Sequence, residues 1–167
     1  GLGAKVVGYD VYQSETAKQV VEFLPLDEFL KQSDIISCHM PYIKGQNENF
    51  INEEFISKMK DHAILINTAR GEVLDLEVAV KAIENNKLDG LAIDVIANEK
   101  SLFFKNFENG KMDTPLHQKL IDLYPRILIT PHVASSTDKA LNDMIEVSLQ
   151  NMDEYLNTGK CKNSLIK

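Results

Sequence analysis

Three residues of this chain have side chains that together suit proton transfer on a carboxylate-bearing substrate: Arg70, Glu99 and His132. An arginine guanidinium is permanently charged and planar, so it can grip a carboxylate through two parallel hydrogen bonds. Histidine suits general acid–base catalysis near neutral pH, and a neighbouring carboxylate stabilises its imidazolium form. Each residue also has an ordinary interpretation, as a strand-end arginine paired with a surface acid, a solvated loop acid and a loop histidine.

All three residues follow segments that are predicted to be β-strands. Apolar stretches predict strands at Lys5–Tyr9, Asp34–His39, Ala63–Asn67, Gly90–Asp94 and Ile127–Thr130, with a shorter one at Val21–Phe23. Helical patterns lie between them at Ser14–Val20, Leu26–Gln32, Asn52–Lys58, Leu76–Asn85 and Leu116–Leu123. Asp75 and Thr114 are the expected N-caps of the last two helices.

Alternation of strands and helices predicts an α/β fold, a Rossmann-like doubly wound parallel sheet. The carboxyl ends of its parallel strands meet at one edge, where open α/β sheets bind ligands. We therefore expect Arg70, Glu99 and His132 to lie at the same edge of the sheet.

Asp10 ends the first predicted strand and is a candidate for cofactor recognition. Dinucleotide-binding domains place a carboxylate here to accept hydrogen bonds from the adenosine ribose hydroxyls. An NADP site would offer an arginine nearby, but Val11, Tyr12 and Gln13 follow. Asp10 therefore favours NAD over NADP, and the alternative is an aspartate that caps the next helix.

Four blocks of the sequence resemble, in the same order, motifs of the D-isomer-specific 2-hydroxyacid dehydrogenases. Met59–Gly71 resembles M-K-x-G-A-x-L-I-N-x-[AGS]-R-G, although His62 replaces the usual small residue. Phe29–Pro41 resembles L-x-x-S-D-[IV]-[IV]-[ST]-x-H-x-P. Gly90–Glu99 and Leu128–Ala134 resemble G-x-x-x-D-V-[YF]-x-x-E and [LIV]-[LIV]-T-P-H-x-[AG].

The resemblance implies an NAD-dependent oxidoreductase that interconverts a 2-keto acid and a D-2-hydroxy acid, with pyruvate and D-lactate as the expected pair. It makes Arg70 the clamp on the substrate carboxylate and carbonyl, His132 the general acid/base and Glu99 the partner of that histidine. No metal is expected. The residues that the resemblance implies for NAD binding are Asp10, His39, Pro41, Thr68, Ala69, Arg70, Asp94, His132 and Ala134.

Two features of the sequence leave the identity of the substrate undecided. Phe103 and Phe104 resemble a pair in the D-lactate and D-2-hydroxyisocaproate branch, but Ser135 and Ser136 stand where lactate-type members carry aromatic residues. A small pair there would widen the substrate pocket. The alternatives are a D-2-hydroxyisocaproate, hydroxypyruvate or phosphoglycerate dehydrogenase, or a non-enzymatic NAD(H)-sensing protein, since some transcriptional corepressors share this fold.

The start of the chain favours a fragment of a longer protein. Gly1–Gly3 looks like a helix end that runs directly into a strand, and the family's glycine-rich phosphate loop is expected upstream of it. We expect residues 1–133 to be the C-terminal part of an NAD-binding domain, and residues 134–167 to return towards an absent substrate domain. The fragment alone is expected to be inactive.

The last predicted helix, Asp138–Leu156, is amphipathic. We interpret its apolar side as a core-packing stripe at the domain junction. The residues of this stripe are Leu141, Met144, Ile145, Leu149, Met152 and Leu156.

Composition argues against nucleic acid and membrane partners. The net charge of the 167 residues is −7, and no dense run of lysine and arginine or long apolar stretch occurs. Cys38 and Cys161 fit no metal or redox spacing, and Cys38 is expected to be a buried free thiol. We expect a cytoplasmic protein that acts on a small molecule and, by the resemblance, forms a homodimer when full-length.

Overall fold

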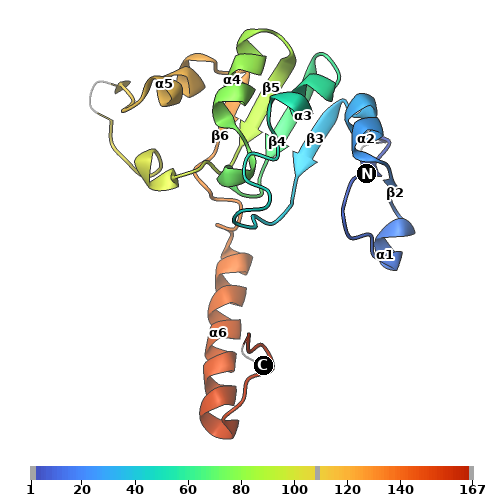
Figure 1. Ribbon diagram of the computed structural model, residues 1–167. Helices are drawn as coiled ribbons and strands as arrows, with labels where there is room; N and C mark the ends of the chain where they lie inside the picture. Colours follow the sequence, from blue (N-terminus) through green and yellow to red (C-terminus); the bar gives the residue numbers. More distant parts are fainter. Residues whose placement is uncertain (1–2, 108–109, 166–167) are drawn as a thin grey trace. The chain divides into compact units, whose positions relative to one another are not determined.

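The computed structural model describes residues 3–107 and 110–165, and the chain divides into two compact units, Gly1–Pro131 and His132–Lys167. The first unit alternates strands and helices (Figure 1). Its elements are β1 (Val7–Gly8), α1 (Glu15–Lys18), β2 (Glu22–Phe23), α2 (Leu26–Gln32), β3 (Ile35–Cys38), α3 (Glu53–Lys58), β4 (Ala63–Asn67), η1 (Gly71–Val73), α4 (Leu76–Glu84), β5 (Leu88–Ile93), η2 (Glu99–Ser101), α5 (Pro115–Asp122) and β6 (Ile127–Ile129). The helix end predicted at Gly1–Gly3 lies mostly outside the described residues.

Every strand pair in the described part of the chain is parallel, which confirms the predicted α/β class. Strands β1 and β2 pair with each other, and the other four form one sheet in the order β3-β4-β5-β6. Helix α2 and strand β4 begin and end at the predicted residues, whereas β1 is shorter than the predicted Lys5–Tyr9. The four-stranded sheet brings the carboxyl ends of β3, β4, β5 and β6 to one edge.

A row of helices, α2 to α5, packs beside this sheet, each helix contacting the next (Figure 1). Burial alternates along β4, where Ala63 and Leu65 are buried and Ile64 is partly exposed. One face of the sheet therefore forms the core. The predicted N-caps are confirmed, because the side chain of Asp75 accepts from Val78 N and that of Thr114 accepts from His117 N, each at 3.1 Å.

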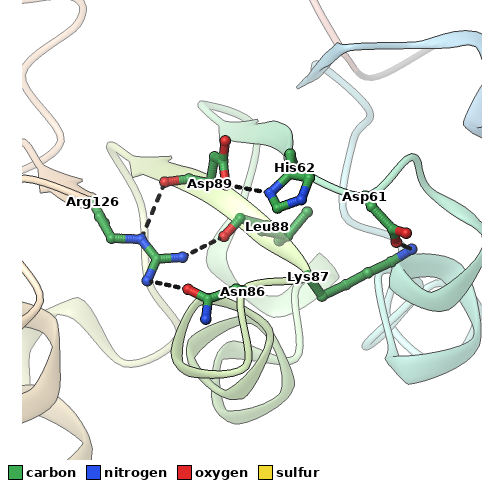
Figure 2. A network of polar contacts seen from close by, with 7 residues as sticks. All are labelled: Asp61, His62, Asn86, Lys87, Leu88, Asp89 and Arg126. Carbon is green, nitrogen blue, oxygen red and sulfur yellow. Dashed lines mark hydrogen bonds and ion pairs between the residues drawn. The ribbon is translucent and has the colours of Figure 1, made fainter.

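At the amino ends of β4 and β5, a polar network ties strands to turns (Figure 2). The guanidinium of Arg126 donates to the carbonyl oxygens of Leu88 and Asp89 and to Asn86 Oδ1. His62 Nδ1 lies 2.9 Å from Asp89 Oδ1, and His62 has a φ of +67°. This left-handed conformation favours glycine, which is one of the small residues that the resembled motif has at the position of His62.

The second unit is dominated by α6 (Asp138–Thr158), whose N-cap Thr137 accepts from Ala140 N at 3.2 Å. The prediction that the apolar stripe of α6 packs at a domain junction of the whole protein stays a prediction. None of its described residues is buried, and the stripe residues are 47–78% exposed. In the described part of its own unit, α6 has no second helix or strand to pack against. Among the described residues, no helix is long and apolar enough to cross a membrane.

Both cysteines are free thiols, and the predicted burial of Cys38 is confirmed. Cys38 is buried at the end of β3, and burial raises the pKa of its thiol to about 12. The thiol therefore stays protonated at neutral pH and is unsuited to act as a nucleophile. Cys161 is half-buried.

His117 on α5 should make this helix sensitive to acid. It is 8% exposed, and its Nδ1 has no hydrogen-bond partner in the described part of the chain. Burial lowers its pKa from the ordinary 6.5, while the charge of Asp113 opposes this shift and that of Lys105 adds to it. Between the lowered pKa and 6.5 the unfolded chain binds more protons than the folded one, so the free energy of unfolding falls as the pH decreases below 6.5.

We expect amide hydrogen exchange in α5 of the whole protein, corrected for its intrinsic pH dependence, to be faster at acidic pH than at neutral pH. His117→Leu removes the titrating group and should abolish this difference. A pH response of equal size in the variant would show that another group is responsible.

Candidate cofactor and active site

A pocket of about 390 Å³ opens at the carboxyl ends of β3 and β4. The two chain segments that follow these neighbouring strands line it, as expected for an open parallel sheet. It brings together five of the predicted site residues with two that the sequence did not indicate. The lining residues are His39, Met40, Pro41, Tyr42, Thr68, Ala69 and Arg70.

The side chain of Asn67, the last residue of β4, holds the turn that carries Arg70 through two hydrogen bonds to its backbone. The Asn67 side chain is fully buried, accepts from Ala69 N at 3.1 Å and donates to Arg70 O at 3.0 Å. The exposed Arg70 side chain donates from Nη1 to Ala69 O at 2.7 Å. Because a buried amide must be hydrogen-bonded, Asn67 fixes the backbone on both sides of this bend. Asn67 was not among the residues predicted for the site, although a polar residue at the end of a buried strand was the available signal.

Gly71 lets this turn approach the segment that leads to Glu99. A Cβ atom on Gly71 would lie 1.9 Å from Ile96 C and 2.1 Å from Ala97 N. Both atoms belong to the backbone, so side-chain rotation cannot relieve the contact. The glycine of the Arg-Gly pair is thus needed for a close approach between the turn after β4 and the chain after β5. Glu99 is half-buried and opens η2, where its carbonyl accepts from Leu102 N and Phe103 N.

Asp94, which follows β5, joins the ends of three strands. It is 6% exposed, and its backbone N–H donates to Asn67 O at 3.0 Å. Its carboxylate accepts from Thr130 Oγ1, while Thr130 N donates to Ile93 O at 3.0 Å. Thr130 was not predicted as a site residue, although it lies in the block that contains His132. This arrangement fixes a carboxylate at the predicted ligand-binding edge.

His39 and Asp10 both lie at strand ends, as predicted. His39 Nε2 lies 2.9 Å from Ser37 Oγ, and the backbone carbonyl of the intervening residue accepts from Thr68 Oγ1 at 3.4 Å. Asp10 is exposed, and its Oδ1 accepts from Tyr12 N at 2.8 Å. The side chain of Ser14 caps α1, so the alternative role of Asp10 as a helix cap is wrong.

His132 and Ala134 belong to the second unit. His132 opens this unit with a φ of +54° and an exposed side chain. The joint action of Arg70, Glu99 and His132 therefore stays a prediction.

Comparison with known proteins gives consistent matches. A family model described as "D-isomer specific 2-hydroxyacid dehydrogenase, NAD binding domain" matches residues 1–134. The chain is 36% identical over 167 residues to an aromatic 2-oxoacid reductase of Clostridium sporogenes, covering 99% of this chain and 50% of that protein. It is 38% identical over 161 residues to a D-lactate dehydrogenase of Lactiplantibacillus plantarum, covering 96% of this chain and 48% of that protein.

Among solved structures, the D-lactate dehydrogenase of Lactobacillus jensenii with NAD⁺ superposes with a TM-score of 0.89 at 34% identity, covering 99% of this chain and 49% of that one. This similarity confirms the Rossmann-type fold. The chain spans about half the length of the curated relatives it matches.

Proposed function

Since the chain belongs to the NAD-binding-domain family of the D-isomer-specific 2-hydroxyacid dehydrogenases, we propose that the whole protein interconverts a 2-keto acid and a D-2-hydroxy acid with NAD. The observation that carries the proposal is the pocket at the carboxyl ends of β3 and β4, with Arg70 in its lining. A permanent planar cation in an open pocket suits a substrate that bears a carboxylate.

The described residues fit the cofactor. The exposed carboxylate of Asp10, at the carboxyl end of β1, can accept hydrogen bonds from ribose hydroxyls. Thr68 and Ala69, which line the pocket, would contact the dinucleotide. Asp94, held by Thr130, would lie on the nicotinamide side. When bound, NAD carries the hydride of the reaction.

The chain's own residues would supply binding and proton transfer. The guanidinium of Arg70 would grip the substrate carboxylate and orient its carbonyl group. His132 would donate a proton to the carbonyl oxygen that becomes the hydroxyl, and Glu99 would stabilise the imidazolium before that transfer. In the oxidative direction His132 would take the proton back.

Asp10→Ala should weaken NADH binding and narrow the preference of the whole protein for NADH over NADPH. The ribose hydroxyls lose their acceptor, and the carboxylate no longer repels the additional phosphate of NADPH. Steady-state kinetics with both cofactors would measure the preference. Asp34→Ala is the matched control, because Asp34 precedes β3 and pairs with Lys60 at the opposite edge of the sheet. An unchanged preference in Asp10→Ala would remove Asp10 from the cofactor site.

Pyruvate and D-lactate are the first candidate pair, since a D-lactate dehydrogenase is among the similar proteins. An aromatic 2-oxo acid is the second. The similarity to an aromatic 2-oxoacid reductase favours it, as does the small pair Ser135 and Ser136 after the catalytic histidine segment.

Oxidation of NADH by the whole protein, measured with pyruvate, phenylpyruvate, 2-ketoisocaproate and hydroxypyruvate, tests this proposal. A larger kcat/KM for phenylpyruvate than for pyruvate would select the aromatic candidate. NADH binding without turnover of any 2-keto acid would instead favour an NAD(H)-sensing protein. The homodimer and the cytoplasmic location stay predictions. Sedimentation of the whole protein would test whether it is a dimer.

A further inference from the structure

One wall of the pocket is formed by the loop after β3, which is closed by hydrogen bonds between its own residues. Tyr42 lines the pocket, and its ring packs against the hydrophobic core. Its hydroxyl donates a hydrogen bond to the carboxylate of Glu48, six residues further along the loop. The side chain that forms the wall is thus held at both ends, by apolar packing at the ring and by a charged acceptor at the hydroxyl.

Further contacts close the same loop and anchor it. Asn47 donates from Nδ2 to Pro41 O and accepts from Ile43 N at Oδ1, each at 2.7 Å. At the end of the loop, Asn49 N donates to Glu72 O at 2.9 Å. Glu72 belongs to η1, which begins directly after Arg70. The Tyr42 wall and the Arg70 turn are therefore parts of one hydrogen-bonded assembly.

The electrostatic surroundings keep the Tyr42 hydroxyl a donor. The hydrogen bond to Glu48, followed by partial burial and the negative charges of Glu48 and Glu72, raises the pKa of Tyr42 to about 12. The phenol therefore stays protonated over the pH range in which the protein would work.

We propose that Tyr42 is a positioning residue for the dinucleotide: its hydrogen bond to Glu48 holds the loop as a preformed wall of the pocket beside Thr68–Arg70. A loop without this bond must be ordered when the ligand binds, and that loss of conformational freedom opposes binding. The inference rests on the proposed function, because it takes NADH as the ligand.

The test compares four variants of the whole protein by fluorescence titration with NADH and by steady-state kinetics. Tyr42→Phe keeps the ring but removes the donor, and it should raise the Kd and the KM for NADH by about three- to tenfold with kcat little changed. Glu48→Ala should have the same effect, whereas Glu48→Gln retains an acceptor oxygen and should bind nearly as the wild type. The double variant Tyr42→Phe/Glu48→Ala should be no weaker than either single variant, because both remove the same bond.

Tyr124→Phe is the matched control, since Tyr124 is 71% exposed and precedes β6 at the amino edge of the sheet. It should leave NADH binding unchanged. Wild-type affinity in Tyr42→Phe, additive losses in the double variant, or a fall in kcat without a change in KM would each overturn the positioning role. A wild-type protein that does not bind NADH would instead refute the proposed function.

Discussion

Replacing His132 by asparagine should lower kcat/KM for 2-keto acid reduction by about 10²–10⁴-fold, the usual contribution of general acid–base catalysis. NADH binding should remain largely intact, because the variant loses a proton donor and keeps a polar side chain. Asparagine is the informative substitution here. His132 has a φ of +54°, a conformation that asparagine tolerates better than alanine does, so the loss reports on chemistry and not on backbone strain.

The matched control for this experiment is His62→Asn. His62 is also an exposed histidine with a positive φ, +67°, but it lies at the amino end of β4, in the network of Figure 2. This variant should retain normal turnover. Near-wild-type kcat/KM in His132→Asn, measured by NADH oxidation in the whole protein, would contradict the proposed mechanism.

Gly71→Ala should damage both stability and activity. The new methyl group would lie 1.9 and 2.1 Å from backbone atoms of Ile96 and Ala97, so the two chain segments must separate. Such overpacking against backbone should lower the free energy of unfolding by about 3 kcal/mol or more. The displaced segments carry Arg70 and lead to Glu99, and a misplacement of about 1 Å in a catalytic site can lower the rate by about 10²-fold.

Gly90→Ala is the matched control. It also replaces a glycine by alanine, but without an overlap between the new methyl group and the backbone. A Cβ atom on Gly90 would meet Ile64 side-chain atoms at 3.5 Å, an ordinary van der Waals contact. Urea unfolding and steady-state kinetics of the two variants should therefore differ clearly, with Gly90→Ala close to the wild type. If Gly71→Ala were as stable and active as Gly90→Ala, the close approach would have no functional importance.

The sequence by itself determined the elements and their order. The apolar run Ala63–Asn67 and the helical pattern Leu26–Gln32 match β4 and α2, because hydrophobic periodicity and capping are local properties of the chain. The alternation of these elements also determined the parallel pairing. That pairing predicted that the carboxyl ends of the strands would lie at one edge of the sheet, and the residues after β3 and β4, Arg70 among them, line a pocket there. That β3 and β4 are neighbours came from the structure.

Only the tertiary structure decided how that edge is held together. Three hydrogen bonds depend on backbone geometry that no local pattern specifies. They join Asn67 to the Arg70 backbone, Thr130 to Asp94, and Tyr42 to Glu48. The close approach of Gly71 to Ile96 joins the segment after β4 to the segment after β5.

The apolar side of α6 shows the same difference between pattern and packing. Its periodicity indicated an amphipathic helix, which is a local property, but its burial depends on a partner surface elsewhere. In the described residues that side is exposed. Periodicity determines which face of a helix is apolar, and only the packing of elements distant in sequence decides whether that face is covered.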